Sequence, residues 1–99
     1  MTEWTWDPDK DRLNRRQHQG LGLAAGALVL ADPLALSQPD PHPDGDRWRT
    51  LGSAAGIAVL LVVHTGPVAG PDGREIGRII SVRKATPRER RAYEERADG

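Results

Sequence analysis

The sequence predicts an α+β domain in which helices pack on an antiparallel sheet, in the order β-α-α-β-β-β-α. One reason is that helix start signals stand near both ends of the chain, at Asp7-Pro8 and at Thr86-Pro87. The other is that apolar stretches with strand character follow one another between them, separated by turns rich in glycine and proline. These stretches are residues 47–51, 57–65 and 75–83.

The composition indicates one cytoplasmic domain, residues 1–99. A chain of 99 residues is long enough for a single core, with little left for a linker. It has no cysteine, which excludes disulfides and thiolate metal sites, and its N-terminus lacks the order of a secretory signal. The most apolar segments, 21–31 and 57–63, are shorter than the roughly 20 residues that a membrane helix requires. We therefore expect a cytoplasmic protein with no membrane partner.

The N-terminal segment predicts a short strand followed by a helix. Trp4 and Trp6 alternate with polar residues and so share one face of the strand. Asp7 has the character of a helix N-cap, and acidic residues follow it in the first turn. The helix is expected to run to about Gln19, because basic residues gather in its last turn and Gly20 stands just past its end.

The next segment predicts an apolar helix and then a loop. Residues 21–31 place apolar side chains at spacings of three and four, as on the buried face of a helix. Gly22 and Gly26 weaken this helix by roughly 1 kcal/mol each relative to alanine. From residue 32 to residue 46 the chain is rich in proline, which removes backbone donors, so we expect no regular element there.

The second half predicts three strands and a final helix. Residues 54–56 suit a tight antiparallel connection, and residues 57–63 are nearly all apolar, as in a central strand covered on both faces. The helix begins with a capping box, in which Thr86 and Glu89 stand three residues apart. It is expected to run to about Arg96.

The charges are segregated along the chain, although Lys plus Arg and Asp plus Glu both number 14. Acidic residues gather in 3–11 and 40–46, whereas basic residues gather in 12–16 and 74–96. A neutral total can therefore hide a basic face that attracts phosphate. The alternative is a solvated surface of ion pairs, because several glutamates lie at helix spacing from these arginines.

Most familiar sites are absent from the sequence. Residues 40–46 resemble the start of a calcium loop, but the twelfth position is Leu51 instead of a bidentate glutamate. The histidines at 18, 42 and 64 lack metal-ligand spacing. We expect His64 to be a hydrogen-bonded sheet residue, and His18 to be either solvated or a proton carrier near neutral pH. No serine stands in a nucleophile elbow, and the glycine-rich stretch lacks the lysine of a phosphate loop.

The predicted strand end at Arg83-Lys84, followed by Glu89-Arg90, has suitable chemistry for a phosphate. RNA cleavage by its own 2′-hydroxyl needs a proton acceptor, a proton donor and fixed positive charge on the phosphate. Arginine suits the last role because its planar fork binds phosphate oxygens in pairs. Strand geometry points Arg83 and Lys84 to opposite faces, so we expect only one of them to line a given cleft. The same residues equally suit a salt-bridged corner between strand and helix.

The order and spacing of several short motifs resemble those of the BrnT family of small bacterial toxins. The resemblance covers nearly the whole chain. Its motifs are Trp6-Asp7-Pro8, Lys10, Asn14, His18, Asp32-Pro33, Arg47-Trp48, His64-Thr65, residues 78–85, Glu89-Arg90 and Tyr93-Glu94.

The resemblance implies a RelE-like fold and a metal-independent endoribonuclease, without a cofactor, that inhibits translation. It also implies a BrnA-like antitoxin as the partner, in a heterotetramer with the toxin. Operator DNA is then bound only through the antitoxin. By position, catalytic roles fall to Arg83, Lys84 and Glu89, and contacts with RNA phosphate fall to Arg47, Arg78, Arg90 and His18.

The chain departs from the family pattern at two places. The family usually has a lysine where this chain has Gln17, and an aromatic residue in the second helix where this chain offers Leu23 and Leu30. The second change preserves a core, because apolar residues of similar size substitute for one another. The first is expected to weaken RNA binding.

Three functional hypotheses follow. The first is a toxin with ribonuclease activity, and the second is a RelE-like module that binds RNA or an antitoxin without efficient cutting. These two hypotheses differ in one requirement: efficient cutting needs a base and an acid within hydrogen-bonding reach of one phosphate site. The third is a metal-binding or adaptor domain built on the Pro-Asp-His loop, which titration with calcium and zinc would test.

Overall fold

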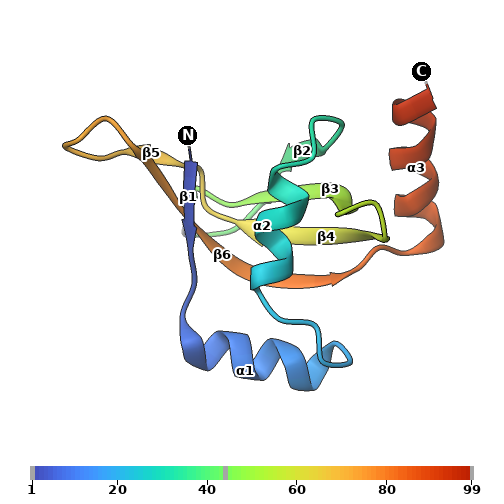
Figure 1. The fold of residues 1–99 in the computed structure, drawn as a ribbon, viewed down its shortest axis with the longest axis horizontal. Coiled ribbons are helices and arrows are strands. Elements are labelled where there is room, and N and C mark those ends of the chain that lie inside the picture. Colours follow the sequence, from blue (N-terminus) through green and yellow to red (C-terminus); the bar gives the residue numbers. More distant parts are fainter. Residues whose placement is uncertain (1, 44, 99) are drawn as a thin grey trace.

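The computed structural model describes residues 2–43 and 45–98, with side chains described through Arg96. Three helices accompany a sheet built from six strands within these residues (Figure 1). The elements in chain order are β1 (Thr2–Thr5), α1 (Pro8–Gln17), α2 (Ala24–Leu30), β2 (Leu36–Pro39), β3 (Trp48–Ala54), β4 (Ala58–His64), β5 (Val68–Ala69), β6 (Glu75–Lys84) and α3 (Pro87–Asp98).

The sheet is mostly antiparallel, with the strand order β1-β6-β4-β3-β2 and β5 paired to β6. Among the described strands, only β1 runs parallel to its neighbour, β6. The predicted α+β class is therefore confirmed. The predicted element order omitted two short strands.

Neither of those two strands was predicted: β2 lies in residues 32–46, where no regular element was expected, and β5 lies in the turn between the predicted strands 57–65 and 75–83. Leu36–Pro39 pairs with β3 at the edge of the sheet, where Pro39 is tolerated as the last residue of the strand. Val68–Ala69 pairs with the start of β6. Proline excludes a central strand but not a short edge strand, so the prediction was wrong for residues 36–39.

Two element boundaries also differ from the prediction. Helix α1 ends at Gln17, because His18 is its C-cap and Gln19 takes a φ of 56°. Helix α2 begins at Ala24, three residues later than expected. The predicted tight turn between β3 and β4 is confirmed: Ala55 and Gly56 have φ of 54° and 74°, and Ile57 N–H donates to the Ala54 carbonyl.

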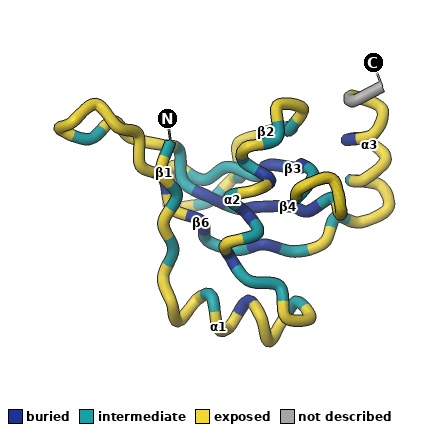
Figure 2. Tube along the Cα trace, in the orientation of Figure 1, coloured by how far each residue is buried: buried dark blue, intermediate teal, exposed yellow. Residues whose placement is uncertain are grey.

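The core lies between α2 and one face of the sheet, as the dark segments in Figure 2 show. Leu23 and Val29 contribute from the α2 region and are fully buried, as are Val62 of β4 and two residues of β6. Gly26 permits this packing, because a Cβ there would stand 3.0 Å from a Val82 methyl group. The glycine that weakens the isolated helix therefore allows the helix to approach the sheet.

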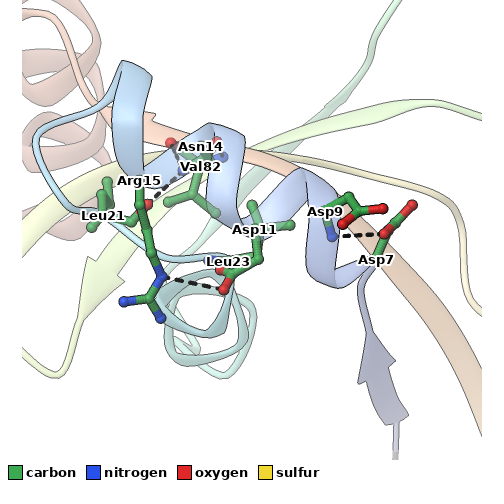
Figure 3. Close-up of polar contacts among 8 residues, drawn as sticks. All are labelled: Asp7, Asp9, Asp11, Asn14, Arg15, Leu21, Leu23 and Val82. Atoms are coloured by element: carbon green, nitrogen blue, oxygen red, sulfur yellow. Dashed lines mark hydrogen bonds and ion pairs between the residues drawn. The ribbon is translucent and has the colours of Figure 1, made fainter.

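Helix α1 is attached to the sheet by the buried side chain of Asn14 (Figure 3). Its amide nitrogen donates to the carbonyls of Val82, at 2.9 Å, and Leu21, at 2.8 Å. Its oxygen accepts from the Val82 N–H at 3.1 Å. The Asp11 carboxylate accepts from the Leu23 N–H at 2.7 Å, and this bond lowers the pKa of Asp11. These contacts fix the turn after α1 against the last residues of β6.

His64 confirms the expectation of a hydrogen-bonded sheet residue. It lies on β4 and is 5% exposed. Its Nδ1 is 2.8 Å from the Thr65 carbonyl, which makes Nδ1 the donor and leaves Nε2 to accept from Thr50 at 2.6 Å. Burial lowers the pKa of His64. No helix in the described part of the chain is long and apolar enough to cross a membrane.

Candidate functional site

Most of the predicted site residues fall into two groups at different points along β6. Arg83 and Lys84 end the strand, whereas Arg78 lies opposite Thr65, five residues before Arg83. Five strand residues span roughly 17 Å. Arg47 belongs to the group of Arg78, because it directly precedes Trp48, whose partner in β4 is His64, the partner of Ile79 in β6. The fold therefore does not bring Arg47 and Arg78 to the strand end that holds Arg83.

One cavity, of about 420 Å³, surrounds the end of β6, and we call it the β6-end cleft. Three parts of the fold converge there: the turn after α1, the last two residues of β6 and the N-cap of α3. The residues that line it are Gln17, His18, Gln19, Arg83, Lys84 and Thr86.

Arg83 and Lys84 both line this cleft, so the expectation that only one of them would do so was wrong. Strand alternation holds within the sheet, where Arg83 pairs with Leu61 and Lys84 with Leu60. The cleft, however, lies around the end of the strand instead of over one face, so side chains of either direction reach it. The cleft thereby holds a guanidinium, an ammonium and the His18 imidazole.

Arg83 is held in place by Glu89 of α3. Its two terminal nitrogens donate to the two carboxylate oxygens at 2.7 and 3.0 Å. The Thr86 N–H also donates to this carboxylate, at 2.9 Å, and the Glu89 N–H donates to the Thr86 hydroxyl, which confirms the predicted capping box. The bonds from Arg83 are the main cause that lowers the pKa of Glu89 to about 2. Glu89 is thus ionised at neutral pH and is a weak proton acceptor.

Arg90 lines a different cavity, of about 370 Å³, which Lys84 also borders. The hairpin between β3 and β4 supplies its other side, including Ile57, which is 87% exposed. Arg90 lies 3.8 Å from Glu94 in an exposed ion pair. Lys84 therefore stands between the β6-end cleft and the surface around Arg90.

A third cavity, which we call the α3 groove, lies between α3 and the sheet face opposite α2. It measures about 200 Å³. Arg49 and Arg88 both line it, and sequence reasoning identified neither as a site residue. Strand alternation places Arg49 on the same face as Leu51, but only the position of α3 shows that this face borders a cavity. The full lining is Leu36, Gln38, Arg49, Leu51, Leu61, Arg88, Glu89 and Ala92.

The segment that resembles a calcium loop engages its described carboxylates in other contacts. Asp40 forms an ion pair with Arg49 at 3.3 Å, and Asp46 accepts from the Gly66 N–H at 3.0 Å. Asp44 lies outside the described residues. Among the described residues, no group of three or more His, Cys, Asp or Glu side chains is arranged to hold a metal ion.

These cavities and the sheet define a small α+β protein with clustered cations at the end of one strand, a class of surface suited to an anionic ligand. The family model described as "Ribonuclease toxin, BrnT, of type II toxin-antitoxin system" matches residues 6–89. The chain belongs to the BrnT family of ribonuclease toxins of type II toxin–antitoxin systems, which confirms the resemblance. Membership implies an antitoxin partner.

One solved structure supports the same assignment. It is the crystal structure, at 1.1 Å resolution, of the ribonuclease toxin BrnT from Brucella abortus. The two chains are 27% identical, with a TM-score of 0.62 over 87% of this chain and 97% of the Brucella chain. A comparison with curated proteins finds no match.

Proposed function

We propose that this chain is an endoribonuclease that cuts RNA without a metal ion and thereby inhibits translation. In the proposed reaction the 2′-oxygen of a ribose bonds to the adjacent phosphorus while the bond from phosphorus to the 5′-oxygen breaks. One proton leaves the 2′-hydroxyl and one is given to the 5′-oxygen. The observation that carries the proposal is the β6-end cleft of a ribonuclease-family chain, which holds an imidazole beside two cationic side chains.

The roles follow from the chemistry of the groups in the cleft. Arg83 is suited to bind the phosphate oxygens as negative charge grows on them, and Lys84 adds a second positive charge. His18 supplies the imidazole of the cleft, and we assign the two proton transfers to it because an imidazole has one nitrogen that can accept a proton and one that can donate. Glu89 is better suited to orient Arg83 than to transfer a proton, because its carboxylate stays ionised and bound.

The remaining cations are proposed to contact RNA outside the cleft. Arg90 and Lys84 border the same cavity, so we propose that they contact the same or neighbouring phosphates. Arg47 and Arg78, which lie beside the first half of β6, are placed to contact phosphates farther along a bound strand. We also propose that the fold is RelE-like, which superposition on a RelE toxin would test.

The central test is cleavage of single-stranded RNA in the presence of a chelator by the parent protein and by Arg83→Ala. We expect the parent to cut and Arg83→Ala to lose at least about tenfold in rate, because a charge-assisted phosphate contact is worth roughly 1.5 to 3 kcal/mol. Arg91→Ala is the matched control, since Arg91 is exposed on α3 and lines none of the three cavities.

Because Arg83 also holds α3, its loss could act through folding, and His18→Ala separates the two effects. His18 lies in the turn after α1, and within the described residues no hydrogen bond or ion pair joins it to α3. An unchanged rate per folded molecule in both variants would contradict the proposed site. If the parent binds RNA but does not cut it, including in a translating extract, the non-cutting module is favoured instead. Gln17, in the place of the lysine usual in the family, also favours that alternative.

We propose that the antitoxin is BrnA-like and forms a heterotetramer in which two antitoxin chains dimerise and each binds one toxin. Acidic and apolar residues of such a partner would cover the cations of β6 and α3 and so block RNA, and only the partner would bind operator DNA. Co-expression with the product of the neighbouring gene, followed by mass determination in solution at low and high salt, tests this. A partner mapped by crosslinking to a surface away from β6 and α3 would contradict the blocking mechanism.

A further inference from the structure

The α3 groove combines a small apolar floor with a polar rim. Its floor is formed by three leucines, of which Leu61 is only 5% exposed. Its volume of about 200 Å³ lies below the roughly 300 to 1,000 Å³ typical of pockets for drug-sized ligands. The groove is therefore matched to a single flat ring system and not to an extended molecule.

The rim offers hydrogen-bonding groups that suit the edge of a purine. Gln38 and Arg49 are register partners on β2 and β3, so their side chains stand side by side on the groove. Arg88 faces them from α3, and within the described part of the chain it forms no ion pair. A glutamine amide pairs with the N6 and N7 atoms of adenine and an arginine with the O6 and N7 atoms of guanine, whereas pyrimidines have no N7.

The groove shares a wall with the β6-end cleft. Glu89 lines the groove and Arg83 lines the cleft, and the two side chains are joined by hydrogen bonds of 2.7 and 3.0 Å. A strand whose phosphate meets Arg83 can therefore turn an adjacent base across α3 into the groove. Single-stranded RNA is commonly read in this way, with bases splayed out onto apolar or guanidinium surfaces.

We propose that the α3 groove is a subsite for one unpaired purine base next to the phosphate bound at Arg83. The proposal rests on the proposed function, and it adds to it a preference for purine at one position of a single-stranded substrate. Gln38, Arg49 and Arg88 determine this preference, whereas Arg83 and Lys84 bind phosphate whatever the base.

The test measures binding of three short fluorescent strands with 2′-O-methyl riboses, which the protein cannot cut because the attacking hydroxyl is blocked. The strands are oligoadenylate, oligouridylate and a matched abasic strand. We expect the full-length parent to bind oligoadenylate about tenfold more tightly than the abasic strand, as stacking and pairing of one base allow, and oligouridylate with an intermediate affinity.

The decisive variant is Ala92→Trp, which fills the groove from an exposed position on α3. It should reduce the ratio of adenylate to abasic affinity to below about threefold while the abasic affinity stays unchanged. Gln38→Ala, on the exposed edge strand β2, should lower the same ratio without filling the groove. Glu95→Trp is the matched control, because Glu95 is exposed on α3 and does not line the groove, and it should keep the parental ratio.

The outcomes separate this inference from the proposed function. Parental binding of the abasic strand as tightly as oligoadenylate overturns the base subsite and leaves RNA binding intact. An unchanged ratio in both Ala92→Trp and Gln38→Ala, with circular dichroism showing folded protein, overturns it as well. Absence of binding to all three strands by the parent overturns both the subsite and the proposed ribonuclease.

Discussion

Helices α1 and α3 are both rich in charged residues, yet different kinds of contact attach them to the rest of the molecule. Helix α1 is held by the buried amide of Asn14, which makes three hydrogen bonds with the backbone. Helix α3 is held by the Arg83–Glu89 pair at its start and by Tyr93, whose hydroxyl donates to Asp32 at 2.5 Å. The bonds that join α1 to β6 are therefore neutral on both sides, whereas both anchors of α3 include an ionised carboxylate. The Asp11 carboxylate of α1 binds the backbone just before α2 and not the sheet.

This difference determines which part of the site responds to its surroundings. Neutral buried hydrogen bonds change little with salt or pH, whereas partly exposed ion pairs are screened and titrate. Helix α3 supplies one wall of the α3 groove and the cap of the β6-end cleft. We infer that α1 fixes the position of the cleft, while α3 is the wall whose position acid or salt can change.

The largest effect is expected from Asn14→Ala, which removes the neutral anchor. The substitution leaves both backbone groups of Val82 unpaired and should lower the free energy of unfolding by about 3 kcal/mol. The melting temperature should fall by roughly 12 to 24 °C in a domain of this size. Calorimetry measures the change, with Lys10→Ala on the exposed face of α1 as the control. A fall of less than about 1 kcal/mol would remove the contrast between the helices.

Tyr93→Phe is expected to have the next largest effect, because it keeps the ring and removes the bond to Asp32. That bond is the main cause that raises the pKa of Tyr93. Its loss should cost about 1.5 kcal/mol, since the acceptor is ionised. Hydrogen exchange should speed up in α3 and leave α1 unchanged. Equal acceleration in both helices would mean that α3 is not attached independently.

Thr86→Ala tests the start of α3 and should cost about 1 kcal/mol, the usual value for a lost N-cap. Thr86→Ser retains the hydroxyl and serves as the matched control. Thermal unfolding of both variants measures the difference. If serine destabilises the protein as much as alanine does, the methyl group of Thr86, and not its cap, is what matters.

The smallest effect is expected from Glu89→Gln, which removes the negative charge of a partly exposed ion pair. It should lower the free energy of unfolding by about 0.5 to 1 kcal/mol at neutral pH. Because the folded state lowers the pKa of Glu89 from 4.5 to about 2, the carboxylate stabilises the fold above about pH 4.5. This contribution is lost as the pH falls toward 2. The difference in the free energy of unfolding between parent and variant, measured with urea, should therefore shrink over that range. The contribution of His64 cancels because both proteins contain it. A difference that does not vary with pH would contradict the charged anchor.

Sequence reasoning succeeded where the signal is local and failed where it depends on a distant partner. The capping box at Thr86 and the turn at Ala55-Gly56 were predicted because their residues are neighbours in the chain. The role of Asn14 could not be predicted, because Val82 lies 68 residues away. Strand β2 was missed because four residues ending in proline become a strand only beside β3.

The candidate site shows the same division. The motif at Arg83-Lys84 and its pairing with Glu89 were accessible from the sequence, since strand end and capping box are adjacent. The approach of His18 to that strand end required the fold. Arg49 and Arg88 were missed because the groove they share exists only through the placement of α3.

The amide of Asn14 has a consequence for how copies of this protein behave at high concentration. Strand β1 covers β6 only as far as Arg78, so the remaining edge of β6 could recruit a strand from another molecule. The amide occupies both the N–H and the carbonyl of Val82, as one residue of a neighbouring strand would. At the opposite edge of the sheet, β2 ends in Pro39, which has no N–H to donate. Each edge thus carries one feature that hinders the strand pairing from which aggregation begins.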